Sequence, residues 1–268
     1  ILDIQVNQKQ SIDLIWQKIV SETITAMEKE PILQSFLQST VLDHSSLGDS
    51  LSFHLANKLS NHALPLKLLQ PLMNQAFNQD KILYATSRDL QATVDRDSAC
   101  SVYSTPFLYF KGFLALQAHR VTHNLWLQRN QSLALMLQHS ISTHFAVDIH
   151  PAAKIGSGIL IDHATGLVIG ETAVIEDSVS IMQSVTLGGT GKDSGDRHPK
   201  IRKGVLLGPG AKILGNIEIG EGSMVAASSV VLKSVPSHSI VAGVPAEVVG
   251  KSDVNEPSKV MNHYFKPC

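Results

Sequence analysis

The chain has little cysteine, almost no net charge and no long apolar run. Its two cysteines, Cys100 and Cys268, form neither a metal-binding spacing nor a disulfide framework. Cys100 is expected to be a small buried residue rather than a redox group. The net charge is -1 over 268 residues, and Lys and Arg do not cluster. The sequence therefore predicts no binding to nucleic acid or to an anionic membrane.

No apolar stretch approaches the roughly 18 to 20 residues that are needed to cross a bilayer. The first residues also lack the basic segment and apolar block of a secretory signal. We therefore expect a cytoplasmic protein. A hydrophobic content of 43% and a length of 268 residues are typical of one or two globular domains with a sizeable core.

Residues 1–145 contain few glycines and show apolar residues at helical spacing. They recur at i, i+3, i+4 and i+7 from Ile12 to Ile19, behind Ser11 as a possible N-cap. Further helices are expected at 30–42, 48–59, 65–78, 87–95, 106–129 and 132–144. This half is interpreted as an all-helical domain that ends before Pro151, because proline disfavours helix in front of it.

An aliphatic residue then returns at every sixth position. The positions are Ile155, Ile161, Ile169, Ile175, Ile181, Leu187, Leu207, Ile213, Ile219, Val225 and Val231. Six residues suit a short strand and a turn, and three such units close one triangular coil. The sequence predicts a parallel β-helix over residues 146–251, with these side chains inside a prism. Residues 252–268 are polar and are expected to form a flexible tail.

The period fails at two places. Two extra residues lie near Gly166, and the twenty positions from Leu187 to Leu207 predict an extruded loop of roughly a dozen or more residues. Loops of this length inside a regular array are usually functional or disordered. This loop contains His198.

His163 is a candidate general base because acids lie near it in the sequence. Asp162 precedes it directly, and Asp148 lies fifteen positions earlier, about one coil away. Residues one coil apart lie on adjacent strands roughly 5 Å apart. A carboxylate there would fix the imidazole tautomer and stabilise the protonated ring. In the loop, Arg197 suits a substrate carboxylate, although it could equally be a solvated charge.

Several segments of the chain match one known family. They are Asp148–Gly156, Asp162–Gly166, Gly170–Ile175, Val185–Gly191, Gly195–Ile201 and Ala242–Ala246, with Asp95–Asp97, Ser104–Pro106 and Lys111–His119 further upstream. Together they resemble serine O-acetyltransferase, a member of the hexapeptide-repeat acyltransferases. The repeats alone are shared by many acyltransferases, whereas the histidine-bearing segments together are specific. Ser98 stands where many relatives have proline, which leaves Asp97 in place.

The resemblance implies transfer of the acetyl group from acetyl-CoA to the hydroxyl of L-serine, the first step of cysteine synthesis from serine. His163 would be the general base and Asp148 its orienting partner. Transfer would be direct, without an acyl-enzyme, and no metal is expected.

The resemblance also assigns the groups that bind serine. Asp97 and Asp162 would hold its amino group, and Arg197 and His198 its carboxylate. Two acids opposite a guanidinium fork suit a zwitterion. Feedback inhibition by L-cysteine at the same four residues is expected.

Acetyl-CoA binding and assembly are likewise implied by the family. Acetyl-CoA would lie in a groove between neighbouring β-helices, with contacts expected at Thr190, Gly210, Ala227 and Lys251. The β-helix would be left-handed, and trimers would pair into a homohexamer through the helical domains. Relatives that bind O-acetylserine sulfhydrylase end in Ile, whereas this sequence ends Phe265–Cys268, so this complex is not predicted.

Two other enzyme classes and a purely structural repeat stay open on the residues alone. A hexapeptide acyltransferase that modifies a sugar or antibiotic hydroxyl would need a catalytic His but not the paired acids and the Arg-His anchor. A zinc enzyme of the γ-carbonic-anhydrase kind would need three converging histidines, for which His150, His163 and His198 are available. A close histidine pair within one repeat is missing from the sequence, which disfavours this class. The acid-histidine pattern also makes a purely structural role the weakest interpretation.

Overall fold

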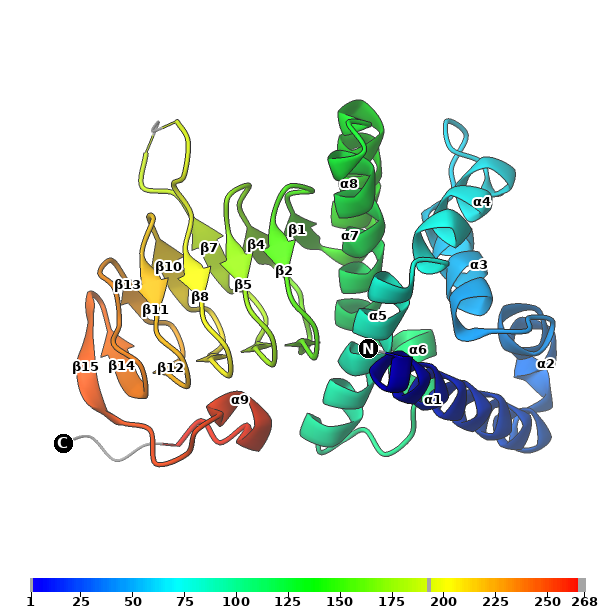
Figure 1. The fold of residues 1–268 in the computed structure, drawn as a ribbon, viewed down its shortest axis with the longest axis horizontal. Helices are drawn as coiled ribbons and strands as arrows, with labels where there is room; N and C mark the ends of the chain where they lie inside the picture. The colour runs from blue at the N-terminus through cyan, green and yellow to red at the C-terminus, as the bar shows by residue number, and fades with distance from the viewer. Residues whose placement is uncertain (1, 192–193, 265–268) are drawn as a thin grey trace.

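The computed structural model describes residues 2–191 and 194–264, and its first half is helical (Figure 1). The helical elements are α1 (Leu2–Lys29), η1 (Pro31–Leu33), α2 (Gln34–Leu37), η2 (Gln38–Leu42), α3 (Leu47–Leu59), α4 (Leu66–Phe77), α5 (Asp80–Arg96), α6 (Ser104–Tyr109), α7 (Lys111–Leu127) and α8 (Gln131–Phe145). The predicted all-helical half is therefore confirmed, although several predicted helix boundaries are not.

The first differences lie in the first 42 residues. Because α1 begins at Leu2, Ser11 lies inside the helix and is not an N-cap. The helix expected over 30–42 is a succession of 3-10, α and π turns. At its end the carbonyl of Thr40 accepts a hydrogen bond from the Ser50 hydroxyl at 2.6 Å, which ties the π turn to α3.

The single helix expected over 106–129 is two helices, α6 and α7. Phe110 between them is extended, with φ -81° and ψ 107°. The start of α7 packs directly on the β-helix, because a Cβ at Gly112 would lie 2.0 Å from the carbonyl oxygen of Ile161. Cys100, before α6, is 5% exposed, as the sequence predicted.

The second half is a parallel β-helix of three sheets, which we name A, B and C. Sheet A contains β1 (Val147–Ile149), β4 (Leu167–Ile169), β7 (Thr186–Gly188), β10 (Lys212–Leu214) and β13 (Val230–Val231). Sheet B contains β2 (Lys154–Ile155), β5 (Val174–Ile175), β8 (Lys200–Ile201) and β11 (Glu218–Ile219). Sheet C contains β3 (Leu160–Ile161), β6 (Ser180–Ile181), β9 (Leu206–Leu207), β12 (Met224–Val225), β14 (Ser239–Gly243) and β15 (Ala246–Lys251). Only β15 runs antiparallel to its neighbour among the described strands.

The sixfold residues lie inside the prism, as predicted. Ile161 pairs with Ile181, which pairs with Leu207, and all three are buried. The prediction missed Ile201, which is fully buried and pairs with Ile175. The sixfold phase therefore resumes at β8, and the chain leaves the prism between β7 and β8. The left-handed sense of the β-helix remains a prediction from the family resemblance.

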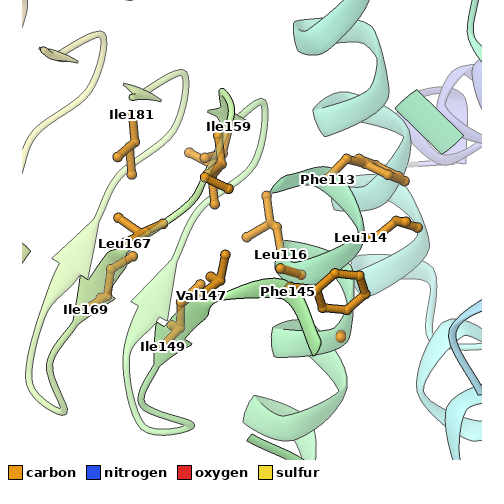
Figure 2. Packing of buried hydrophobic residues seen from close by; sticks show 14 of the residues in the cluster. Phe113, Leu114, Leu116, Phe145, Val147, Ile149, Ile159, Leu167, Ile169 and Ile181 are labelled. Atoms are coloured by element: carbon orange, nitrogen blue, oxygen red, sulfur yellow. The ribbon is translucent and has the colours of Figure 1, made fainter. Parts of the chain in front are cut away.

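The helices α7 and α8 close the first end of the prism. Figure 2 shows Leu116 and Phe145 facing Val147 of the first coil and its neighbours. Beside this apolar contact, a buried ion pair of the helical half bonds to the first coil. Arg120 Nη2 lies 2.6 Å from Asp89 Oδ2 and also donates to Gly156 O at 2.7 Å. Asp89 also accepts from the amide of Ile159 at 2.9 Å. The helices therefore fix the position of the first coil.

Beyond β15 the chain forms α9 (Pro257–Val260), in which Pro257 and Ser258 are buried. The polar composition did not predict this packing, and the division of the chain at 145/146 and 251/252 stays an interpretation. The chain end discussed for sulfhydrylase binding, Phe265–Cys268, lies outside the described residues. Within the part that is described, no helix combines the length and the apolarity that crossing a membrane requires.

Candidate active site

The turn from β3 to β4, residues 162–166, carries the candidate general base, and we call it the His163 corner. The amide of Asp162 still donates to Ile181 O at 2.9 Å, so the ladder holds up to this residue. His163 and Ala164 then adopt left-handed conformations, with φ 55° and 64°. Such conformations cluster at functional sites. The side chain of His163 is 70% exposed, with Nε2 3.7 Å from Asp162 Oδ2.

Asp97 brings a second acid to this corner. It caps the C-terminus of α5, and its Oδ1 accepts from the amide of Ala99 at 2.8 Å. Burial raises the pKa of Asp162 above its ordinary value, His163 opposes the rise, and the Asp97 carboxylate adds to it. Asp97 therefore lies close enough for its charge to act on Asp162, which directly precedes the candidate base.

The turns from sheet A to sheet B carry the other predicted substrate residues. We call residues 170–173 and 195–199 the Arg197 corner. His198 is only 7% exposed. The hydroxyl of Thr172 accepts from the amides of Arg197 and His198, each at 3.0 Å, and therefore donates to His198 Nδ1 at 2.9 Å. The amide of Thr172 also donates to Nδ1 at 3.2 Å. These bonds place the proton of neutral His198 on Nε2, as a donor for a carboxylate.

Gly170 makes room for this arrangement, because a Cβ there would lie 2.0 Å from the His198 ring. Burial and the Arg197 charge lower the pKa of His198, which favours the neutral ring. Arg197 Nη2 lies 2.7 Å from Glu171 Oε2, and Nη1 donates to Gly195 O at 3.1 Å. Arg197 is therefore held on both branches of its guanidinium.

Sequence reasoning missed the roles of Thr172, Glu171 and Gly170. All three stand in the Gly170–Ile175 segment, which marked the family but received no role. The available signal was the polar Glu-Thr pair at a turn of the repeat, where a corner otherwise needs only small residues.

Within one chain, Asp148 does not lie beside His163. Its partner on the adjacent strand is Val168, so the expectation that it lies one coil from His163 is wrong. The two extra residues in the first coil shift the register, and Ile161 pairs twenty positions ahead. Asp148 accepts a hydrogen bond from Gln138, and its charge acts on His150 near the Arg197 corner.

The histidines proposed for zinc are also divided. His150 and His198 lie at the Arg197 corner, where Arg197 and Glu171 act on both rings, whereas His163 lies at the other corner. In the described ranges 2–191 and 194–264, no group of three or more His, Cys, Asp or Glu residues is placed to hold a metal ion.

The expected acetyl-CoA residues fall in three places. Gly210 and Ala227 lie on later turns from sheet C to sheet A, in line with the His163 corner. The amide of Gly210 donates to Gln183 O on the preceding turn at 2.9 Å. Thr190 lies at the start of the loop beside the Arg197 corner. Lys251 is the exposed last residue of β15 and lines a cavity of about 860 Å³. The turn column from His163 to Ala227 spans three strand spacings, roughly 14 Å.

Family models match both halves of the chain. Residues 15–118 match the model for the serine acetyltransferase N-terminal domain, and residues 198–233 match the bacterial transferase hexapeptide model of six repeats. The serine acetyltransferase of Escherichia coli K12 is 53% identical over 257 residues, which cover 96% of this chain and 94% of that protein. Serine acetyltransferase 4 of Arabidopsis thaliana is 54% identical, covering 94% and 72%.

Solved structures give the same result for the fold. A serine acetyltransferase in complex with cysteine has a TM-score of 0.93 at 52% identity, covering 96% of this chain and all of that one. The soybean enzyme complexed with serine has a TM-score of 0.88 at 55% identity, covering 89% and 99%. The Brucella abortus enzyme with coenzyme A has a TM-score of 0.89 at 48% identity, covering 91% and 98%. The chain therefore belongs to the serine acetyltransferase family.

Proposed function

We propose that the chain transfers the acetyl group of acetyl-CoA to the hydroxyl of L-serine, which gives O-acetyl-L-serine and CoA. The observation that carries the proposal is the division of charge between the two corners. Asp97 and Asp162 lie together beside His163, whereas Arg197 and the Nε2 donor of His198 lie together at the other corner. An amino acid zwitterion needs both.

His163 acts as the general base in this proposal. It takes the proton of the serine hydroxyl while the oxygen attacks the thioester carbonyl. The tetrahedral intermediate then loses the carbon–sulfur bond, and the proton passes from the imidazolium to the sulfur of CoA. Transfer is direct, so no side chain of the enzyme carries the acetyl group. The 70% exposure of His163 leaves its ring free to contact both substrates.

The active site forms between neighbouring copies of the chain. Among the described residues, no hydrogen bond or ion pair joins the His163 corner to the Arg197 corner. The two corners lie at the two edges of sheet A. When three copies pack around sheet A, one corner of each copy therefore lies against the other corner of the next copy. Asp148, at the Arg197 edge, would then reach His163 of the neighbouring copy and orient it. Trimers pair into hexamers through the helical halves, where α1 exposes Leu14 and Ile24.

Acetyl-CoA lies along the turns that continue from the His163 corner. Gly210 and Ala227 leave the backbone accessible there, which places the thioester beside His163, while Thr190 of the neighbour and Lys251 approach its flanks. The relative solved with coenzyme A supports this use of CoA.

Cysteine competes with serine for the same subsite. It shares the ammonium and carboxylate groups of serine and differs only at the thiol, so Asp97, Asp162, Arg197 and His198 bind both. The relatives solved with serine and with cysteine support the binding of both amino acids. Inhibition that is not competitive with serine would contradict the shared subsite.

Release of free CoA tests the reaction. The protein is incubated with acetyl-CoA and either L-serine or a panel of sugars that bear free hydroxyls. We expect CoA release with L-serine alone, and D-serine, which reverses the order of the groups around Cα, serves as the matched control. Turnover with sugars but not with L-serine would overturn the proposal.

A further inference from the structure

The outer face of sheet C carries an apolar stripe that the C-terminal segment covers. Leu206, Met224 and Ile240 are 0%, 3% and 9% exposed although they point away from the prism, and Val249 and Met261 pack on them. In Figure 1 the red segment runs back from β15 below the coils towards the helices and includes α9. Burial of this stripe stabilises the docked tail.

Two glycines let the tail lie directly on the coils. Gly204 and Gly222 both have positive φ, 71° and 63°, at turns from sheet B to sheet C. A Cβ at Gly204 would lie 2.9 Å from Glu256 Cγ, and one at Gly222 would lie 2.3 Å from the Asn255 carbonyl oxygen. Both contacts are too short for a side chain. The tail therefore fits against the prism at one defined position.

Ser258 in α9 is fully buried and bonded to the second coil. Its hydroxyl donates to Ser178 O at 2.5 Å, and its carbonyl accepts from the Ser180 hydroxyl at 2.8 Å. The Ser180 hydroxyl in turn accepts from Arg96 Nη1 at 3.0 Å. One hydroxyl thus joins the tail, strand β6 and the end of α5.

Arg96 stands directly before Asp97, the acid assigned to the serine ammonium. Burial lowers the pKa of Arg96 to about 10, with the carboxylates of Glu256, Asp89 and Asp95 opposing, so the guanidinium stays charged at neutral pH. The amide of Asp97 donates to Thr93 O at 3.0 Å. The last turn of α5 therefore sets the position of Asp97.

The second acid, Asp162, depends on the same strand. Its amide donates to Ile181 O at 2.9 Å, and Ile181 follows Ser180 in β6. The bond from Arg96 to Ser180 consequently ties the backbone that carries Asp97 to the backbone that holds Asp162. This tie fixes the separation of the two acids, on which a bound ammonium depends.

We propose that Arg96 is a positioning residue for the serine subsite, and that the docked tail, through Ser258 and Ser180, holds Arg96 in place. The proposal rests on the proposed function, because Asp97 and Asp162 matter here as ligands of the serine amino group. Neither Arg96 nor Ser180 needs to touch substrate.

The test compares the KM values of the two substrates in the full chain. Ser180→Ala keeps the packing and removes the hydroxyl that Arg96 and Ser258 share. We expect the KM for L-serine to rise about three- to tenfold, the range of one hydrogen bond, and the KM for acetyl-CoA to change less than about twofold. Arg96→Met should act in the same direction, Arg96→Lys should restore part of the loss, and the double variant should be no worse than Arg96→Met.

Ser252→Ala is the matched control, because the side-chain hydroxyl of this tail serine bonds only to the backbone of Val254, at an exposed site. It should leave both KM values unchanged. Equal changes in both KM values, or no change for serine, would overturn the positioning role. A melting curve shows whether Arg96→Met folds. If it does not, the result with Ser180→Ala, which retains the guanidinium, decides the test. Wild-type protein without serine turnover would instead overturn the proposed function, and with it the assignment of Asp97.

Discussion

The His163 corner and the Arg197 corner hold their histidines in opposite ways. His163 sits on a left-handed turn, and its side chain is 70% exposed. His198 is 7% exposed, and the Thr172 hydroxyl and amide fix its ring. At the first corner the backbone is constrained and the side chain is accessible; at the second the side chain itself is fixed.

The difference matches what each corner has to do in the proposed reaction. A general base must reach the reacting hydroxyl and exchange a proton, whereas an anchor must present a donor in one direction. The left-handed conformations of His163 and Ala164 cost about 1 to 2 kcal/mol each. The local hydrogen bonds, such as Thr165 N to His163 O at 2.8 Å, hold this turn together.

The largest effect is expected at the accessible histidine. His163→Ala should lower kcat by about 10² to 10⁴, the range that a general base contributes, with little change in the KM for acetyl-CoA. Steady-state assays of CoA release measure both constants. His139→Ala, which removes an exposed histidine from α8, should leave kcat unchanged. Wild-type turnover in the His163 variant would remove the proposed base and end the functional contrast between the corners.

A smaller effect is expected from loosening the fixed histidine. Thr172→Val keeps the shape of the side chain but removes the hydroxyl that bonds Arg197 N, His198 N and His198 Nδ1. The KM for L-serine should rise about tenfold, and kcat should change less. Thr172→Ser should restore most of the affinity. An unchanged KM would show that the His198 ring does not need the Thr172 hydroxyl to hold its position, and the two corners would then not differ in this respect.

The smallest effect concerns the pH dependence of the acid pair. The Asp97 carboxylate contributes to raising the pKa of Asp162, after burial. Asp97→Asn removes this like charge, so the pKa of Asp162 should fall. Serine binding needs ionised Asp162, and the pH below which the serine KM rises should therefore move downward. Because Asp97→Asn also raises the KM for L-serine at every pH, the comparison uses the shape of the pH profile and not the absolute KM. A profile shifted to higher pH would contradict the proximity of the acids.

The prism could be predicted from the sequence because its rule is local. Ile161 and Ile181 point inward because each coil places an aliphatic residue at the same position relative to its corner. The sixfold spacing alone is enough to identify these residues. Ile201 was missed because the loop at 189–199 interrupts the count, although β8 resumes the same phase. The break at Phe110 was missed because the contact made by the start of α7, Gly112 against Ile161 O, joins residues far apart in the sequence.

The site was predicted as a set of residues but not as an arrangement. The motifs named His163, Asp162 and Arg197, and the proximity of Asp97 to Asp162 agrees with a shared ligand. Counting residues placed Asp148 beside His163, and this was wrong because the first coil has two residues more than the regular eighteen. Sequence spacing in one chain also carries no information on the proposed contact between neighbouring copies.

The loop between β7 and β8 leaves and rejoins the prism at a single corner. Lys200 closes its base, with Nζ donating to Thr172 O at 2.8 Å and to His198 O at 2.7 Å. The ladder on either side is undisturbed, since Val174 pairs with Lys200 as if the loop were not there. Each doubling of loop length costs only about 0.6 kcal/mol. The loop can therefore change in length at little cost to the stability of the core, so its length is set by the site it carries and not by the prism.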